Sequence, residues 1–261
     1  MRFLSSRQTP LMKIGLLVIA FATCSVSSGF GEGLSKGQGD AILNELRQIR
    51  TLLERQQHPP AQQPPSAPEP EKVTLKLGAE YSLGRSDAPV VIVEYTDYQC
   101  PYCSLFHTGA YPEIKKNFID TGKARFVKRD LALDFHPNAL KAAQAARCAG
   151  DQKKFWEMHD ILSSNPNSLG PEAYAKYASA IGLDSGAFKA CIESDKYVTD
   201  IRESGKGADS IGIAGTPSFV VGTVTGDTLD GIKIVGAQPY AVFEMVIKEY
   251  LAAQPGGKAT N

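Results

Sequence analysis

The 261-residue sequence lacks a net charge, internal repeats and a second C-x-x-C motif. Its 28 lysine and arginine residues balance 28 aspartate and glutamate residues, which argues against nucleic acid as a partner. The one C-x-x-C motif, Cys100 to Cys103, could join His107 in a zinc site, but no further motif or histidine pair supplies a fourth ligand. Ser104 stands where covalent haem attachment requires histidine. We therefore expect no metal and no cofactor.

Residues 1–27 have the composition of a secretory signal peptide. Positive residues precede a short apolar core, Ile14 to Ala22, and small residues follow as cleavage sites. Because this core is too short to span a bilayer comfortably, we expect export with cleavage near Ser27 rather than a retained membrane anchor. Cys24 stands where a lipoprotein cysteine could stand, but FATC is a poor match to the small-residue box before such a cysteine. A lipid anchor is the minority interpretation.

Two segments separate this signal from the globular part. Residues 40–57 have apolar side chains at heptad spacings, namely Ile42, Leu46, Ile49 and Leu53. They predict a short amphipathic helix that could oligomerise, dock on its own globular domain or fray, since a lone helix of this length is marginal in water. Residues 58–72 are a proline-rich linker, with six prolines and no large apolar residue in HPPAQQPPSAPEP, and are typical of a semi-rigid spacer. The globular domain is expected at residues 73–253.

The chemistry of the chain is expected in PVVIVEYTDYQCPYC, Pro89 to Cys103. Val90 to Tyr95 is an apolar run that predicts a buried strand, and a helix should begin at Pro101 and be interrupted by Pro112. Cys100 would then lie at the N-terminus of a helix, where unpaired N–H groups and the helix dipole favour a thiolate and lower the pKa of cysteine. We expect Cys100 to attack disulfides and Cys103 to resolve them; a structural disulfide within the motif is the alternative.

The order of elements after the motif predicts an α/β domain. Strands are expected at Thr74 to Leu77, Ala124 to Lys128, Ser218 to Val221 and Ile232 to Val235. Helices are expected at Asn138 to Ala149, Lys153 to Leu162, Pro171 to Ile181, Ser185 to Ile192, Tyr197 to Ser210 and Tyr240 to Ala253. A βαβ half and a ββα half are therefore split by a helical insertion at about residues 136–210.

Export changes the interpretation of the remaining cysteines. An oxidising compartment allows thiols to pair, and four cysteines remain after removal of the signal. If Cys100 and Cys103 form the redox centre, Cys148 and Cys191 can make one structural bridge; two separately buried thiols are the alternative.

Three stretches together resemble the DsbA family of exported thiol-disulfide oxidoreductases. They are EYTDYQCPYC at Glu94 to Cys103, KFWEMHDIL at Lys154 to Leu162, and GTPSFVVG at Gly215 to Gly222. The resemblance covers about Tyr81 to Leu251. It implies a thioredoxin-like fold with an inserted all-helical subdomain, preceded here by the N-terminal helix and the linker.

The resemblance also implies roles for individual residues. The family's attacking and resolving cysteines fall on Cys100 and Cys103, and the dipeptide that tunes redox potential and meets substrate falls on Pro101 and Tyr102. Its cis proline falls on Pro217, so the backbone of Thr216 could pair with an extended substrate strand.

Further positions follow from the same resemblance. The family's buried acid, which assists proton transfer, falls on Glu94, with an acid facing solvent as the alternative. A second disulfide in some members is consistent with pairing of Cys148 with Cys191. We expect His107 to be a packed or surface histidine, and Phe155 and Trp156 to belong to the core.

The predicted function is disulfide formation or exchange in exported, periplasmic proteins, with a membrane redox partner that resets the CPYC centre. Threonine before Pro217, together with CPYC, is closer to the dimeric isomerase relatives than to the dedicated oxidase. A disulfide isomerase or reductase that works as an oligomer through residues 40–57 is therefore one alternative. A non-catalytic adaptor that holds clients in the Thr216 to Pro217 groove is another.

Overall fold

The computed structural model describes residues 35–57, 71–78 and 81–254. The chain forms two compact units, residues 1–66 and 67–261, which are described separately below. The predicted signal peptide (1–27) and most of the predicted linker (58–72) lie outside the described residues. Among the described residues, we find no helix with both the length and the apolar character needed to cross a membrane.

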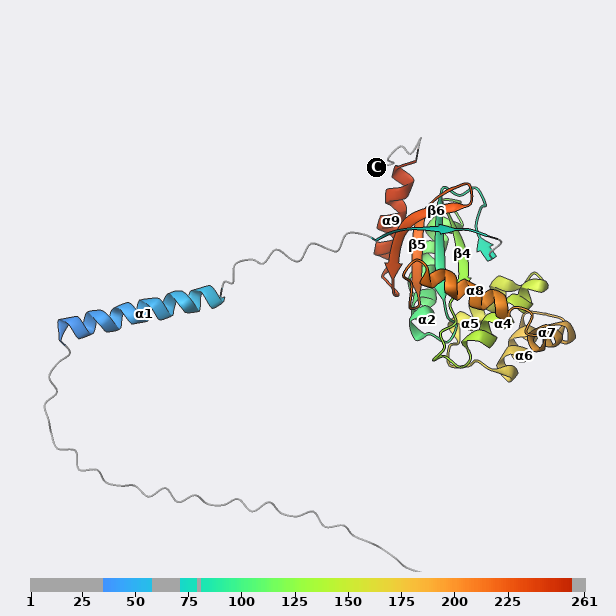
Figure 1. Ribbon diagram of the computed structural model, residues 1–261, viewed down its shortest axis with the longest axis horizontal. Coiled ribbons are helices and arrows are strands. Elements are labelled where there is room, and N and C mark those ends of the chain that lie inside the picture. The colour runs from blue at the N-terminus through green and yellow to red at the C-terminus, as the bar shows by residue number, and fades with distance from the viewer. Residues whose placement is uncertain (1–34, 58–70, 79–80, 255–261) are drawn as a thin grey trace, which may run out of the picture. The chain divides into compact units, whose positions relative to one another are not determined.

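The described part of the first unit, residues 35–57, forms the helix α1 (Lys36–Gln57), drawn in blue in Figure 1. It begins four residues before the predicted start because Ser35 and Gln38 form a reciprocal capping box. The backbone N–H of Gln38 donates to Ser35 Oγ, and the backbone N–H of Ser35 donates to Gln38 Oε1. Six large apolar side chains of α1 are exposed, namely Ile42, Leu43, Leu46, Ile49, Leu52 and Leu53.

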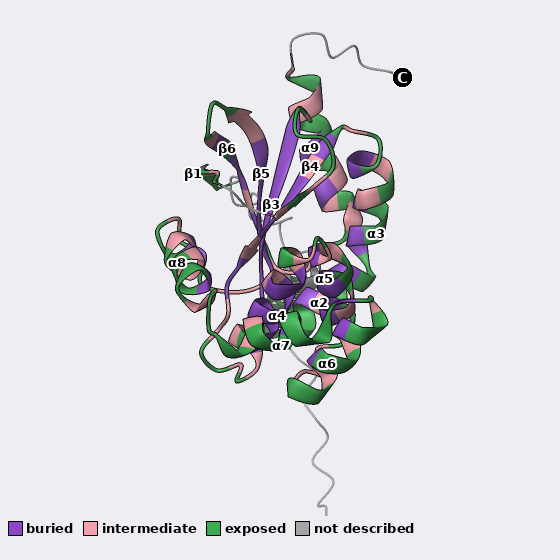
Figure 2. Ribbon diagram, turned by 90° about the vertical axis from the view of Figure 1, so that its right-hand side faces the viewer, coloured by how far each residue is buried: buried purple, intermediate pink, exposed green. Residues whose placement is uncertain are grey.

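The second unit is built on a six-stranded sheet in the order β1-β6-β5-β3-β4-β2. The strands are β1 (Lys72–Lys76), β2 (Tyr81–Leu83), β3 (Val90–Thr96), β4 (Ala124–Asp130), β5 (Ser218–Thr225) and β6 (Thr228–Val235). β3 pairs parallel with β4, and the other neighbours pair antiparallel. Every residue of β3 is buried, as the purple ribbon in Figure 2 shows. β1 begins inside the predicted linker, and β6 begins four residues before the predicted strand.

Helices flank the sheet and form the insertion (Figure 1). Those after the motif are α2 (Pro101–Thr108), α3 (Ala110–Ile114) and the π-helix η1 (Lys115–Ile119). The insertion contains α4 (Ala139–Asp151), α5 (Phe155–Ser164), α6 (Pro171–Ala180), α7 (Ser185–Glu193) and α8 (Val198–Asp209), and α9 (Tyr240–Ala252) follows the last strand. This is the predicted α/β architecture with its inserted helical subdomain.

The predicted interruption near Pro112 occurs at Gly109, between α2 and α3. Proline has no N–H to donate to the carbonyl of Thr108, four residues earlier, and its ring clashes with that carbonyl. The N–H of Gly109 instead closes α2 on the carbonyl of Leu105, at 3.0 Å.

The two faces of β3 enter different cores because side chains alternate along a strand. Val90 and Ile92 pack in one cluster with Phe106 of α2 and Phe243 of α9. Val91, Val93 and Tyr95 pack on the opposite face, with Ala208 of α8 and Ile213. By the same alternation, Glu94 shares the face of Val90 and Ile92 and points toward α2.

The edge strand β2 was not predicted, and it joins the sheet to the insertion. The ring of Tyr81 stacks on that of Phe155, with centroids 3.6 Å apart. The indole N–H of Trp156 donates to the carbonyl of Ser82 at 3.2 Å. Gly150 of α4 lies so close that a Cβ there would come within 2.5 Å of the Tyr81 hydroxyl. Phe155 is buried and Trp156 is half-buried against the core, as expected.

Candidate functional site

The turn between β3 and α2 is held by side chains on both sides. Asp97 Oδ1 accepts from the N–H of Gln99 at 2.7 Å, and Asp97 Oδ2 lies 2.8 Å from His136 Nδ1. Gln99 Oε1 accepts from the N–H of Asn138 at 2.7 Å. These contacts fix the loop that carries Cys100 against the start of the insertion.

Cys100 is the N-cap residue of α2, with extended backbone angles and Pro101 as the first helical residue. Proline is well tolerated there because its missing N–H is one that the helix leaves unpaired. In the thiol form, Cys100 Sγ donates to the carbonyl of Thr216 at 3.3 Å.

The pKa of Cys100 falls from 9.0 to about 5, because groups around the sulfur stabilise the thiolate. The largest contribution is a hydrogen bond from the thiol of Cys103; another comes from the Thr216 side chain, and the backbone N–H groups of Tyr102 and Cys103 add to it. The Thr216 hydroxyl is buried and has no hydrogen-bond partner among the described residues while Cys100 is a thiol. Near neutral pH, Cys100 is therefore a thiolate nucleophile.

The pKa of Cys103 is shifted in the opposite direction from that of Cys100. Its pKa is raised, first by burial and then by the neighbouring charges of Cys100 and Glu94. Both cysteines of the motif are free thiols in the structure. The pair thus combines an acidic attacking thiol, Cys100, with a buried thiol, Cys103, that is protonated in the reduced protein.

The peptide bond between Thr216 and Pro217 is cis and lies directly before β5, beside Cys100. Pro101 is exposed, and the side chains of Tyr102 (64% exposed) and Leu105 (57% exposed) lie one turn apart on α2. The structure thus brings the predicted substrate-binding residues around the sulfur of Cys100. Leu105 adds an apolar side chain that we had not assigned to the site.

Glu94 lies in the interior with no solvent-exposed surface, so the alternative of a solvent-facing acid is wrong. His107, in the last turn of α2, places Nε2 at 3.0 Å from both carboxylate oxygens of Glu94. His107 is packed, as expected, but its contact with Glu94 was not predicted. The role of Glu94 in proton transfer stays a prediction.

From the sequence we did not connect three other buried residues to this pair, namely Tyr98, Lys128 and His159. His159 of α5 places Nδ1 at 2.9 Å from the hydroxyl of Tyr98. Lys128 of β4 is in register with Glu94, lies 4.6 Å from the centre of the Tyr98 ring, and forms a buried ion pair with Asp130. His159 could have been found from the sequence, because it is the histidine of the KFWEMHDIL stretch that carries the family resemblance.

Glu94, His107 and His159 also bring metal-ligand atoms within 4.8 Å of one another. In the structure, both carboxylate oxygens of Glu94 lie at hydrogen-bond distance from His107 Nε2, and His159 Nδ1 lies at hydrogen-bond distance from the Tyr98 hydroxyl. We therefore interpret this cluster as a hydrogen-bonded set of protein groups.

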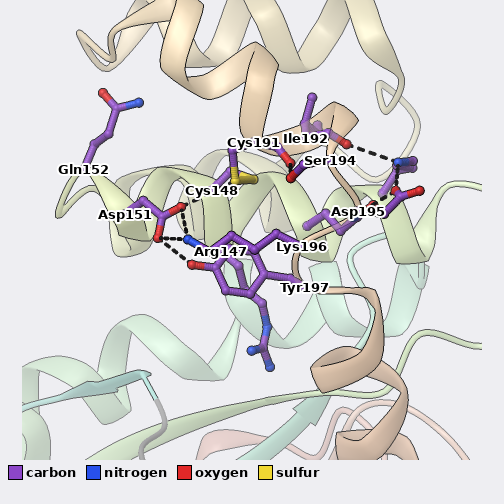
Figure 3. The surroundings of a disulfide bond; sticks show 12 residues. Arg147, Cys148, Asp151, Gln152, Cys191, Ile192, Ser194, Asp195, Lys196 and Tyr197 are labelled. Carbon is purple, nitrogen blue, oxygen red and sulfur yellow. Dashed lines mark hydrogen bonds and ion pairs between the residues drawn. A yellow bond between two sulfur atoms is a disulfide. The ribbon is translucent and has the colours of Figure 1, made fainter.

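A disulfide joins Cys148 of α4 to Cys191 of α7 (Figure 3). Asp151, one turn after Cys148, accepts hydrogen bonds from Lys196 at 2.9 and 3.0 Å and lies 3.4 Å from Cys191 Sγ. The bridge and this polar cluster fasten α7 to α4 within the insertion.

Comparison with known proteins supports the same assignment. The family model described as Thioredoxin matches residues 76–247. A putative protein-disulfide oxidoreductase of Rickettsia felis is 35% identical over 173 residues, covering 63% of this chain and 62% of that protein. Part of the Na(+)/H(+) antiporter NhaA 1 of Salinispora arenicola is 40% identical over 143 residues, covering 54% of this chain and 21% of that protein. The chain therefore spans about a fifth of the antiporter and about three fifths of the rickettsial protein.

Solved structures agree with this result. The crystal structure of Wolbachia pipientis alpha-DsbA1 superposes with a TM-score of 0.59 at 27% identity, covering 67% of this chain and 92% of that one. BdbD from Bacillus subtilis, at 22% identity and a TM-score of 0.59, shares the fold; the match covers 69% of this chain and 98% of that one. Because the family model matches residues 76–247, which make up most of the globular unit, the chain belongs to the thioredoxin family, and its structure is similar to that of DsbA proteins.

Proposed function

We propose that this protein forms or exchanges disulfides in exported proteins through Cys100 and Cys103. The observation that carries the proposal is the position of Cys100, where α2 begins beside the carbonyl of Thr216 and the pKa of the thiol is lowered to about 5. A thiolate at that position is both a nucleophile and a good leaving group.

The oxidase direction begins with a substrate thiolate attacking Cys100 in the Cys100–Cys103 disulfide. The sulfur–sulfur bond breaks, its electron pair goes to Cys103, and a mixed disulfide joins the substrate to Cys100. A second substrate thiolate then attacks the substrate sulfur of that mixed disulfide, and Cys100 leaves as a thiolate. The substrate gains a disulfide and the protein holds two reduced cysteines, which a membrane redox partner must reoxidise.

The site has a surface suited to unfolded clients. The carbonyl of Thr216 lies beside Cys100, and Tyr102 and Leu105 offer exposed apolar side chains on the adjoining turn. An extended client segment could pair with the Thr216 backbone while its cysteine meets Cys100.

The test is oxidative refolding of a reduced client together with capture of the intermediate. Wild-type protein should accelerate refolding, and Cys103→Ala should accumulate client adducts at Cys100 because the resolving thiol is gone. The matched control is Cys100→Ala, which should form no adducts. If wild-type protein neither oxidises clients nor reduces insulin, while client segments still bind near Thr216, the adaptor alternative replaces the enzyme.

A second candidate function is that of an oligomeric disulfide isomerase. It is favoured by six large apolar side chains that α1 leaves exposed, since a helix of this kind commonly buries such residues against another copy. Two or more catalytic units held together could then work on one misfolded client.

This candidate is tested by deleting residues 36–57. The mass in solution should fall to that of a monomer, and rescue of scrambled ribonuclease should fall with it while simple thiol oxidation persists. An unchanged mass would remove the oligomer, and unchanged rescue by a monomer would separate isomerisation from α1.

The proposed compartment is the periplasm or another exported space, as residues 1–27 predict. Expression in a bacterial host followed by mass spectrometry of the recovered protein would locate the cleavage site. Recovery with residues 1–27 attached would contradict a cleaved signal.

A further inference from the structure

Beneath the two cysteines lies a buried acid whose partner is a histidine. Glu94 is fully buried, and His107 places Nε2 at 3.0 Å from each of its carboxylate oxygens. Since carboxylate oxygens accept hydrogen bonds, Nε2 carries a proton and donates it to the Glu94 side chain. The negative charge of Glu94 reaches Cys103, where it helps to raise the pKa of the thiol.

A second histidine lies beside the first, but it cannot carry charge. The rings of His107 and His159 meet edge to face with centroids 4.7 Å apart. The pKa of His159 is held well below its usual value, first by complete burial and then by the charges of His107 and Lys128. His159 is therefore neutral, and the Tyr98 hydroxyl, 2.9 Å from its Nδ1, sets its orientation.

The position of His107 provides a way out for that proton. It lies in the last turn of α2. Of the hydrogen-bonded pair, only His107 has any exposed side-chain surface, 4% against none for Glu94, and His159 is fully buried. A proton on His107 is therefore closer to solvent than a proton on Glu94.

We propose that His107 is the proton carrier of the redox centre, exchanging protons between Glu94 and solvent each time Cys103 opens or closes its disulfide, while His159 is a positioning residue for the His107 ring. This inference rests on the proposed function. When a substrate thiolate opens the disulfide, the electron pair of the sulfur–sulfur bond stays on Cys103. Nδ1 of His107 takes up a proton from solvent as Nε2 passes its proton to Glu94, and Glu94 passes a proton to Cys103, so that one solvent proton is consumed and the imidazole stays neutral.

The reverse step runs the same path. When Cys103 attacks a mixed disulfide on Cys100, its proton goes to Glu94 and then to His107, and the leaving thiolate takes the electron pair. Titratable groups from five elements and one loop surround this path. They are Cys103 and His107 of α2, Glu94 of β3, Lys128 of β4, His159 and Asp160 of α5, Tyr111 of α3, and Tyr98 of the loop after β3. Of these, His107 combines contact with Glu94 and partial exposure.

The test separates the two sulfur steps in a single turnover. Reduced protein is mixed with an aromatic disulfide whose released thiolate absorbs visible light, so that attack by Cys100 releases one thiolate and attack by Cys103 releases the second. In His107→Gln, which keeps a hydrogen-bond donor but cannot carry a proton, the first phase should stay within about twofold. The second phase should slow by roughly 100-fold, at the low end of the contribution of a positioned acid–base group.

Two further variants and a change of solvent distinguish proton transfer by His107 from a structural effect. His159→Gln should slow the second phase by less than His107→Gln, since it only orients the carrier. His136→Gln is the matched control, because His136 also contacts a carboxylate, Asp97, but does not face Glu94, and both of its phases should resemble wild type. In deuterium oxide, the second phase of the wild-type protein should slow and the first should not.

Equal slowing of both phases in His107→Gln would mean a structural role and overturn the inference, as would an unchanged second phase. If His107→Gln does not fold, the solvent isotope effect on wild-type protein decides, and its absence from the second phase overturns the inference. Wild-type protein that releases neither thiolate would instead refute the proposed function.

Discussion

The acidity of Cys100 should appear in the stability of the reduced protein. The pKa of this thiol is about 5 in the fold and 9.0 ordinarily, so between these values the unfolded chain binds more protons than the folded one. The reduced protein therefore gains stability as pH rises from 5 to 9, and the gain is lost as pH falls through 5. From pH 5 to pH 8, the two pKa values correspond to about 3.6 kcal/mol. Solvent near the sulfur screens part of this charge, so we expect about 2 kcal/mol.

The assay is urea unfolding of reduced wild-type protein and reduced Cys100→Ala at pH 5, 6, 7 and 8. The free energy of unfolding of the wild-type protein should rise by about 2 kcal/mol relative to that of the variant across this range. Because both proteins share all other titratable groups, the contributions of those groups cancel in the difference. Absorbance of the thiolate in the ultraviolet should titrate near pH 5 in wild-type protein and be absent from the variant. Parallel stability curves, with a difference that does not change with pH, would refute the account of an acidic Cys100.

Three further predictions concern the scaffold. Replacing Cys148 and Cys191 together with alanine should lower the free energy of unfolding by about 4 kcal/mol, because the bridge closes a loop of 43 residues; a loss below about 1 kcal/mol in urea unfolding would contradict the loop-entropy argument. Gly222→Ala should cost at least about 3 kcal/mol, because its Cβ would lie 2.0 Å from the carbonyl of Asp230, and a wild-type melting temperature would show that the strands separate easily. Gly207→Ala should stabilise α8 by about 0.5 to 1 kcal/mol, since nothing lies within 4 Å of the new Cβ; a lower melting temperature would count against this.

The centre of the fold was predictable because its signals are local. Val90 to Tyr95 is apolar throughout, and Cys100 follows it within one turn, so the sequence alone places a reactive thiol between a strand and a helix. The strand β2, by contrast, has only three residues, which are too few to show the alternation of apolar and polar side chains that identifies a strand. The first half of β6 was missed because Asp230 and Gly231 interrupt its apolar pattern.

The cysteines of the site could be placed from the sequence, and the groups that serve them could not. Tyr98 and His159 are 61 residues apart in the chain, and they meet only because the insertion folds back over the sheet. His107 looked like one packed histidine among others, since nothing local reveals that Glu94 points to the same side of β3 as α2. Alternation along β3 does carry that information: Val90 and Ile92 share the face of Glu94, which makes a polar partner on α2 necessary.

The short strand β2 has a consequence for how the inserted helices pack. The ring of Tyr81 stacks on Phe155 and the carbonyl of Ser82 accepts from the indole of Trp156, so this edge strand contacts the first turn of α5 directly. Substitutions at Tyr81 or Ser82 would therefore change how the inserted helices pack on the sheet while leaving the residues around Cys100 in place.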